Sequence, residues 1–315
     1  MNLNNKLVLV TGASGFVGKN LVQRLKDNYT CKLLTPSHTE CDFAKEESVS
    51  SYFEENKPEV VLHIAGKVGG ILANKNYPAE FFYQNAMMSI LISHYSWLNG
   101  TEKLVTLAAG CGYPKHLEVP YTESDFWNGF PDENSYAYSL AKKNLIVQSW
   151  AYREQYDFNS TVLLPANLYG PHDNFNLESS HVVPALIRKF IEARDKGKNE
   201  VVVWGDGTAS REFLYVDDTT EAIIKMAESC NESGPFNLGT GVETSIKELI
   251  ETIRDYVGYE GNVVWDTSKP NGQPRRFYDM SEFKRVVGYV PSTSLSVGID
   301  KTVKWYEENY SVART

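Results

Sequence analysis

A glycine-rich turn close to the first residue places the strongest constraint on how this chain folds. The β-branched run Leu7–Val10 leads to glycines at positions 12, 15 and 18, and apolar residues at helical spacing follow. In such a turn the first glycine permits a tight bend, the second lets backbone approach a pyrophosphate and the third lets the helix pack on the strand. The N-terminus of the helix offers unpaired N–H groups to phosphates. This context predicts a dinucleotide site, with an ordinary structural turn as the alternative.

Short apolar runs and longer amphipathic stretches alternate through the first half of the chain. The strand-like runs after the first are Lys32–Leu34, Val60–Ile64, Leu104–Leu107 and Thr161–Leu164, and the helix-like stretches lie near 46–56, 79–98 and 136–155. Alternation of this kind predicts an α/β fold, here a Rossmann-type doubly wound parallel sheet with helices on both faces. Ligands of such sheets bind beyond the carboxyl ends of the strands.

The pattern changes after Pro165. We expect, in order, a loop at Asn167–Asn176, a helix at Val182–Ala193, a strand at Val201–Trp204, a strand followed by a helix within Phe213–Met226, and a buried strand at Pro235–Leu238. The chain is therefore expected to cross between two lobes more than once. Residues 1–165 with about 212–240 would form the Rossmann domain, and 166–211 with 241–315 a smaller α+β substrate domain.

Composition excludes several classes of protein. The formal net charge of −9 argues against a nucleic-acid binder, which needs a basic surface. The four cysteines follow neither a disulfide-scaffold nor a zinc-site spacing, so no metal is expected. A signal peptide and an apolar run of about 20 residues, long enough to span a membrane, are both missing. We expect a cytoplasmic protein that does not associate with membranes.

The end of the second strand bears on the choice of dinucleotide. NAD sites usually place an Asp or Glu there to hold the ribose 2′-hydroxyl, whereas this chain has Ser37 and His38. These residues favour NADP, although no arginine is present, and NAD is the less favoured alternative. Asp42 is a candidate contact for adenine, with a turn aspartate as the alternative.

Tyr138 and Lys142 stand four residues apart in a helical stretch, so both lie on one face of that helix. An ammonium close to a phenol lowers the pKa of the tyrosine, which suits proton transfer at neutral pH. The pair follows the strand at Leu104–Leu107, where the ligand crevice of the sheet is expected. An exposed helix pair is the alternative.

The glycine turn and the Tyr–Lys pair resemble those of the extended short-chain dehydrogenase/reductases. Longer sequence segments identify a family more specifically than these two short motifs do. They are Ala65–Ile71, Asn74, Tyr77–Ala79, Cys111–Lys115, Asn167–Phe175, Ser180–Leu186, Val203–Gly205, Arg211–Phe213 and Pro274–Arg276. In this order they resemble the GDP-L-fucose synthases, the GDP-4-keto-6-deoxy-D-mannose 3,5-epimerase/4-reductases, over nearly the whole chain.

The resemblance implies a reaction and its catalytic residues. The family epimerises C3 and C5 of a GDP-linked 4-keto-6-deoxy sugar and reduces C4 with NADPH. Cys111 and His181 are the implied proton-transfer pair, Tyr138 polarises and protonates the C4 oxygen, and Lys142 tunes Tyr138 and holds the nicotinamide ribose. Without the resemblance, Cys111 would be read as a small core residue and His181 as a cap or loop residue.

The resemblance also implies two sets of binding residues. Asn167 and Arg211 match contacts to substrate and diphosphate, although Arg211 has a surface arginine as its alternative and Trp204 could stack on substrate or fill the core. The cofactor set is Gly12, Ser14, Gly15, Phe16, Val17, Ser37, His38, Asp42, Ala65, Gly66, Lys142, Pro165 and His181. The substrate set is Asn167, Lys189, Trp204, Arg211 and Arg276.

One departure from the family bears on the chemistry. The family has a serine or threonine two residues before the active cysteine, where this chain has Ala109. Loss of such a hydroxyl donor costs on the order of 10²–10³ in rate, and Thr106 should not reach the substrate. There are three milder departures. Lys189 stands in place of a family arginine, Asn271 in place of an aspartate and Ser14 in place of another arginine. Three hypotheses stay open: the bifunctional enzyme, an epimerase-only or 4-reductase-only relative on another 4-keto sugar, and a non-catalytic nucleotide-sugar-binding protein.

The resemblance further implies a homodimer formed by the helices near 79–98 and 136–155. Apolar residues support that pairing, although burial within one subunit would explain them equally. They are Phe81, Phe82, Met87, Met88, Ile90, Leu91, Leu145, Ile146 and Trp150.

Overall fold

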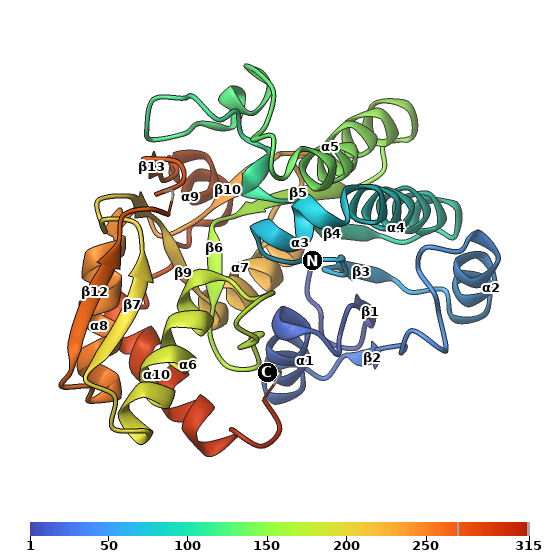
Figure 1. Cartoon of the computed structure of the whole chain (residues 1–315). Coiled ribbons are helices and arrows are strands. Elements are labelled where there is room, and N and C mark those ends of the chain that lie inside the picture. The colour runs from blue at the N-terminus through green and yellow to red at the C-terminus, as the bar shows by residue number, and fades with distance from the viewer. Residues whose placement is uncertain (270, 314–315) are drawn as a thin grey trace.

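A six-stranded parallel sheet forms the centre of the molecule (Figure 1). The computed structural model describes residues 1–269 and 271–313. The strands run in the order β10-β5-β4-β3-β1-β2, and every neighbouring pair is parallel. Their bounds are β1 Leu7–Thr11, β2 Lys32–Leu34, β3 Val60–His63, β4 Lys103–Leu107, β5 Ser160–Pro165 and β10 Phe236–Leu238. The strand order reverses between β1 and β3, which is where an open α/β sheet binds its ligand.

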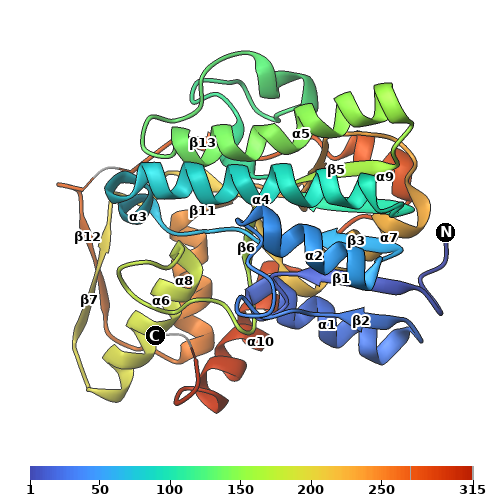
Figure 2. The same cartoon turned by 90° about the vertical axis from the view of Figure 1, so that its right-hand side faces the viewer.

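Helices cover both faces of this sheet, as Figure 2 shows from the side. Val8 and Val10 of β1 pack into one buried cluster with α1 (Phe16–Asn28) and α7 (Val216–Ser229). Leu9 points to the other face, into a cluster with α2 (Glu46–Asn56) and α4 (Pro78–Leu98). This alternation follows from the two-residue period of a strand. Helix α5 (Tyr136–Tyr156) packs along α4, and α9 (Ser281–Val287) packs against α7.

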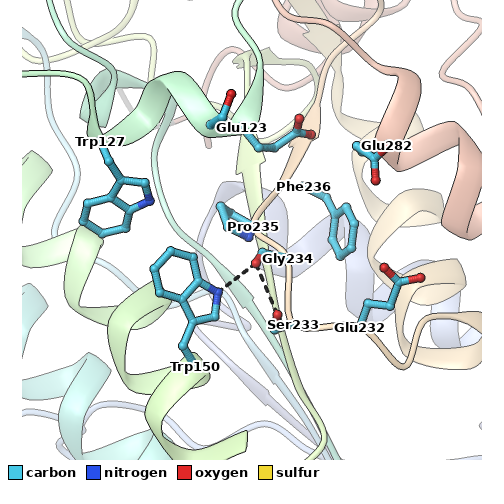
Figure 3. Close-up of a pocket in the computed structure, with 10 residues that line it drawn as sticks. Glu123, Trp127, Trp150, Glu232, Ser233, Gly234, Pro235, Phe236 and Glu282 are labelled. Atoms are coloured by element: carbon cyan, nitrogen blue, oxygen red, sulfur yellow. Dashed lines mark hydrogen bonds between the residues drawn. The ribbon is translucent and has the colours of Figure 1, made fainter. Parts of the chain in front are cut away.

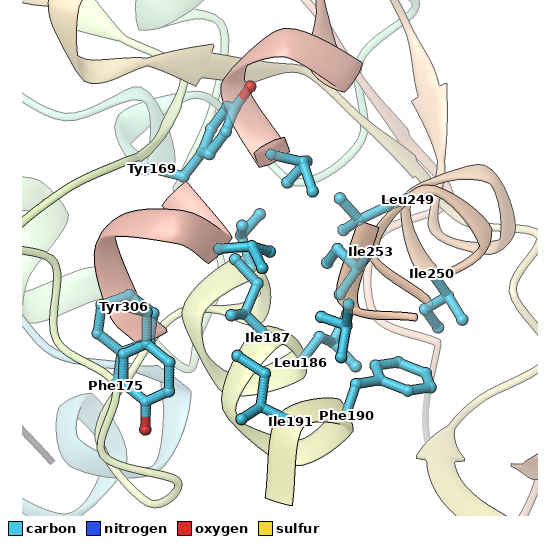
Figure 4. Packing of buried hydrophobic residues seen from close by; sticks show 14 of the residues in the cluster. Tyr169, Phe175, Leu186, Ile187, Phe190, Ile191, Leu249, Ile250, Ile253 and Tyr306 are labelled. Carbon is cyan, nitrogen blue, oxygen red and sulfur yellow. The ribbon is translucent and has the colours of Figure 1, made fainter. Parts of the chain in front are cut away.

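A second lobe is built around its own core (Figure 4). Helices α6 (Val182–Asp195) and α8 (Ile246–Val257) pack together, and α10 (Leu295–Glu308) packs on α8. Strands β7 (Glu200–Trp204) and β12 (Asn262–Asp266) pair in parallel. The apolar residues of α6 and α8 recur every three or four positions, which places them on one helical face. The core residues labelled from these two helices are Leu186, Ile187, Phe190, Ile191, Leu249, Ile250 and Ile253.

Short strand pairs connect the two lobes. Strand β6 (Asn167–Tyr169) pairs with β9 (Phe213–Tyr215). Strand β8 (Ser210–Arg211) pairs with β11 (Thr244–Ser245) on one side and β13 (Arg275–Arg276) on the other. The remaining helical segments are α3 (Ile71–Asn76), η1 (Gly110–Gly112) and η2 (Glu123–Trp127).

The structure confirms the predicted fold class, and the expected strands and helices of the first half lie within a few residues of their predicted bounds. The loop expected at Asn167–Asn176 is wrong at its start, because Asn167–Tyr169 form β6. Three residues are too few to show a periodic pattern, and their partner strand lies more than 40 residues further along the chain. Within the described residues, no helix is long and apolar enough to cross a membrane.

Candidate active site

The glycine turn after β1 leaves space that side chains would close. Gly12 has φ +70°, and a Cβ there would lie 2.9 Å from the Cα of Ala65. A Cβ on Gly18 would overlap the carbonyl oxygen of Gly12, so the third glycine lets α1 approach the turn. The turn closes through the Gly15 N–H, which donates to the Gly12 carbonyl at 2.9 Å. These are the close approaches that the sequence pattern predicted.

The N-terminus of α1 is open to an anion. Gly15 is the N-cap residue, and no side chain caps the helix. The first-turn N–H groups of Phe16 and Val17 have no partner within the helix, and Ser14 is exposed in the turn before them. A dinucleotide diphosphate fits this cradle, because unpaired N–H groups and the helix dipole both favour negative charge.

The loop after β3 is held beside this turn. The Thr11 hydroxyl oxygen accepts hydrogen bonds from the N–H groups of Ile64 and Ala65, each at 3.1 Å. The buried Asn85 side chain bonds both the N–H and the carbonyl of Lys67, at 3.1 and 3.0 Å. Gly66 therefore lies in a fixed loop, where a Cβ would come within 3.2 Å of Lys142 Nζ. Sequence reasoning missed Thr11 and Asn85, because only the fold brings their partners together.

The predicted 2′-phosphate contacts lie in the exposed loop after β2. Both the N–H and the hydroxyl of Ser37 donate to Glu40 Oε2, each at 2.7 Å. His38 is exposed, and its Nε2 lies 3.8 Å from Asp42. The Asp42 carboxylate accepts from the Ala44 N–H at 3.1 Å. Asp42 thus has the turn role that was its alternative, and its contact with adenine stays a prediction.

Tyr138 and Lys142 lie on the first turns of α5, on the helix face that meets the ends of β3 and β4. Lys142 Nζ donates to the carbonyls of Leu107 and Ala65, at 3.2 and 3.4 Å. The Tyr138 ring meets Phe81 edge to face, with centroids 6.2 Å apart. Lys142 is almost fully buried, so the alternative of an exposed helix pair is wrong.

The pKa of Tyr138 does not move as the spacing suggested. Burial, with a smaller effect of Cys111, raises the pKa of Tyr138. Burial also lowers the pKa of Lys142 to about 8. In this arrangement burial sets the direction, and the expected lowering of the tyrosine pKa by Lys142 stays a prediction.

Cys111 follows β4 in the short helix η1, at the carboxyl edge of the sheet. The Ser139 hydroxyl lies 3.2 Å from Cys111 Sγ and 3.1 Å from the Cys111 carbonyl. Burial raises the pKa of Cys111, and Ser139, Arg276 and Lys142 act against that rise. The thiol is thus a half-buried group among polar and cationic side chains rather than a core residue. Ser139, which sequence reasoning missed, is its nearest polar neighbour.

Two guanidinium groups lie side by side where the lobes meet. The parallel pairing of β8 and β13 sets Arg211 opposite Arg276. No ion pair joins either arginine to a carboxylate within the described residues, whereas Arg275 pairs with Glu243 at 2.6 Å. Burial and the charge of Arg276 lower the pKa of Arg211 to about 10. Two part-buried cations without a carboxylate partner can hold a diphosphate, and the surface alternative for Arg211 is wrong.

Arg276 also lies close to Asn167, Cys111 and His181. Its guanidinium donates to Asn167 Oδ1 at 3.4 Å, and its charge acts on both Cys111 and His181. His181 is the N-cap residue of α6 but makes no side-chain cap bond. Desolvation by neighbouring groups, then the charge of Arg276, lowers the pKa of His181, although the residue keeps an exposed surface.

The remaining predicted substrate residues lie on the second lobe. Lys189 Nζ donates to the Val202 carbonyl at 3.0 Å. Trp204 ends β7 and is 59% exposed, so its core-filling alternative is wrong. Pro165, predicted beside the cofactor, ends β5, and its carbonyl would lie 2.9 Å from a Cβ on Gly110.

The strand before Cys111 supplies no hydroxyl to the site. Ala109 is buried and apolar. Thr106 directs its hydroxyl to the Thr161 carbonyl of β5, at 3.4 Å, which confirms that it does not reach the site.

A pocket of about 330 Å³ lies elsewhere, between η2, α5 and the segment before β10 (Figure 3). The Trp150 indole N–H donates to the Gly234 carbonyl at 2.8 Å, and Trp127 lies beside it. Three carboxylates, Glu123, Glu232 and Glu282, line this pocket. None of the predicted site residues lines it.

Comparison with known proteins shows the family of this chain. The model of the NAD dependent epimerase/dehydratase family matches residues 8–239. GDP-L-fucose synthase 1 of Arabidopsis thaliana is 38% identical over 302 residues, which cover 96% of this chain and 93% of that protein. GDP-L-fucose synthase of Escherichia coli strain K12 is 37% identical over 316 residues, covering 98% of each. The crystal structure of a GDP-L-fucose synthetase from Naegleria fowleri bound to NADP has a TM-score of 0.93 at 31% identity, covering 100% of this chain and 97% of that one.

The fold and the glycine turn, with the Tyr–Lys pair, define the class, and the chain belongs to the NAD-dependent epimerase/dehydratase family. Within that family it groups with the GDP-L-fucose synthases, which confirms the resemblance seen in the sequence.

Proposed function

We propose that the protein converts a GDP-linked 4-keto-6-deoxy sugar by epimerisation at C3 and C5 and NADPH-dependent reduction at C4. The observation that carries the proposal is the gathering of Tyr138, Lys142 and Cys111 beside the glycine turn, with Arg276 linking Cys111 to His181. The relatives named as GDP-L-fucose synthases support the substrate class. The NADP-bound structural neighbour supports the cofactor.

Tyr138 and Lys142 serve the reduction. When bound, NADPH supplies a hydride to C4. Because burial keeps Tyr138 protonated, its hydroxyl can donate to the carbonyl oxygen and then transfer the proton to it. Lys142, whose ammonium already lies against the Ala65 and Leu107 carbonyls, holds the ribose and restores charge balance at Tyr138.

Cys111 and His181 serve the epimerisation. A proton next to the ketone is acidic because the carbanion delocalises into an enolate. One member of the pair removes that proton and the other returns one to the opposite face, which inverts the carbon. Ser139 holds the thiol of Cys111 in place.

Arg211 and Arg276 hold the diphosphate, with Asn167 beside the sugar and Trp204 and Lys189 on the nucleoside side. This division assigns NADP to residues 1–165 with about 212–240, and the nucleotide sugar to 166–211 with 241–315. The two buried clusters follow this division in most of their residues, except that Phe283 packs into the core of the sheet and Phe213, Tyr215 and Val216 pack into the core of the second lobe.

The test is to incubate the protein with GDP-4-keto-6-deoxymannose and NADPH in D₂O. We expect deuterium at C3 and C5 of the product together with oxidation of NADPH. Deuterium in the product without oxidation of NADPH would show that the protein only epimerises its substrate. Oxidation of NADPH without deuterium in the product would show that it only reduces C4. If neither occurs, the proposal is wrong.

The Tyr138→Phe variant separates the two steps. Loss of a general acid costs about 10²–10⁴ in rate, so NADPH oxidation should fall by that factor while deuterium exchange falls less. Tyr136→Phe is the control, because Tyr136 is an exposed tyrosine two residues earlier on the same helix. This variant should keep both rates. Equal NADPH oxidation in Tyr138→Phe and the parent would remove Tyr138 from the mechanism.

We also propose a cytoplasmic homodimer that pairs α4 and α5 of two subunits. Phe82, Tyr83, Ile90 and Val147 are exposed apolar or aromatic residues on these helices. Part of the apolar set named from the sequence packs inside the subunit instead, namely Phe81, Leu91, Leu145 and Ile146. The four unpaired cysteines support a reducing compartment.

A further inference from the structure

A second phenol lies beside the reacting groups. The Tyr278 ring follows β13, is 3% exposed and packs against the rings of Tyr113 and Tyr121, with centroids 5.5 and 6.3 Å away. The hydroxyls of these neighbours are occupied. Tyr113 donates to Asn237 Oδ1 at 2.6 Å, and Tyr121 accepts from Gln273 at 2.5 Å. No described group forms a hydrogen bond with the Tyr278 hydroxyl.

Gly110 shows where this hydroxyl lies. A Cβ at Gly110 would overlap Tyr278 Oη, so the phenol fills the volume that a side chain at position 110 would take. Gly110 stands between Ala109 and Cys111, and the charges of Arg276 and Cys111 both act on Tyr278. The hydroxyl is therefore at the reacting end of the site.

The surroundings hold Tyr278 in place and keep it protonated. The buried Glu212 carboxylate accepts the Tyr278 N–H at 3.1 Å and also bonds the N–H groups of Thr240 and Gly241. Burial raises the pKa of Tyr278, so its hydroxyl stays a donor at neutral pH. A donor fixed before substrate binds needs little reorganisation during the reaction.

We propose that the Tyr278 hydroxyl donates a hydrogen bond to the carbonyl oxygen of the bound sugar, in place of the hydroxyl that residue 109 lacks. The inference rests on the proposed function. Negative charge grows on that oxygen both when the enolate forms and when hydride reaches C4, so one donor assists both steps.

The test compares Tyr278→Phe with the parent for deuterium exchange, NADPH oxidation and thermal stability. Removing one such donor lowers kcat by about 10²–10³, and we expect this loss in both steps with KM and Tm nearly unchanged. Tyr113→Phe is the matched control from the same ring cluster. It should lower Tm, because it removes a buried hydrogen bond, and keep kcat.

A hydroxyl restored on the strand should rescue the variant. Ala109→Ser in the Tyr278→Phe background should raise kcat by at least about 10-fold, and the same change in the parent should have little effect. A parent-like kcat in Tyr278→Phe overturns the inference. So does failure of Ala109→Ser to raise its kcat, or an equal loss of kcat in Tyr113→Phe.

The failures of the two proposals are distinguishable. A parent that neither exchanges deuterium nor oxidises NADPH overturns the proposed function, and this inference with it. An active parent matched by an equally active Tyr278→Phe overturns this inference alone.

Discussion

His63 is a fully buried histidine whose protonation state follows from its hydrogen bond. The Thr11 oxygen already accepts two backbone N–H groups, so its own hydrogen points to His63 Nδ1, 2.8 Å away. Nδ1 is therefore the acceptor and the imidazole is neutral. Burial, then the charge of Lys142, lowers the pKa of His63 to about 3.

This burial makes stability depend on pH. Below the ordinary histidine pKa of about 6.5, His63 is protonated in the unfolded chain but stays neutral in the folded chain. The free energy of unfolding therefore falls as pH drops from about 6.5 toward 3. His63→Gln keeps an acceptor for Thr11 without this titration. We expect its stability to change less between pH 7 and pH 5, measured by chemical denaturation. Equal slopes in parent and variant would contradict the argument.

The Glu40 carboxylate accepts hydrogen bonds from the N–H and the hydroxyl of Ser37, the two groups that Ser37 would otherwise donate to a 2′-phosphate. Exposed charge interactions are worth up to about 1 kcal/mol, so Glu40→Gln should lower KM for NADPH by up to about five-fold and change KM for NADH less. Glu47→Gln, on the exposed side of α2, is the control. An equal change for both cofactors would mean that Glu40 does not face the 2′ position.

At the scale of elements, helix α1 depends on a single glycine. In Gly18→Ala the new Cβ would overlap the Gly12 carbonyl oxygen and lie 2.7 Å from the Ala13 Cα. Overpacking of this kind costs about 1–3 kcal/mol, so we expect a lower Tm and weaker NADPH binding by calorimetry. Gly129→Ala, whose Cβ would meet only Pro114 at 3.3 Å or more, is the control and should bind NADPH as the parent does.

The elements that sequence predicted well are those with a local signal. The glycine turn, the β-branched strands and α4 to α6 have a periodicity that short segments reveal. Strands β6, β8 and β13 are two or three residues long, and distant partners define them. The same difference between local and distant contacts decides which site residues the sequence predicts. Tyr138 and Lys142 share a helix, whereas the proximity of Tyr278 to Gly110 exists only after folding.

At the scale of the whole molecule, the exposed face of α4 and α5 should govern assembly. Stable interfaces bury about 800 Å² per partner with an apolar centre. Ile90→Glu places a charge on that face and should convert a dimer to a monomer in sedimentation or light scattering. Val297→Glu, which charges an exposed valine on α10, should leave assembly unchanged. A monomeric parent would contradict the proposed dimer.

The pairing of β8 with β13 gives the second lobe its cationic end, while the thiol comes from η1 after β4 and the Tyr–Lys pair from α5. A nucleotide sugar that contacts both the arginines and the thiol would link the two lobes, each of which has its own hydrophobic core. Its binding free energy then resists separation of the lobes and adds about 2.7 kcal/mol to stability at 100 times Kd. We expect free nucleoside monophosphate, which would reach only one end, to give a smaller rise in Tm than the nucleotide sugar.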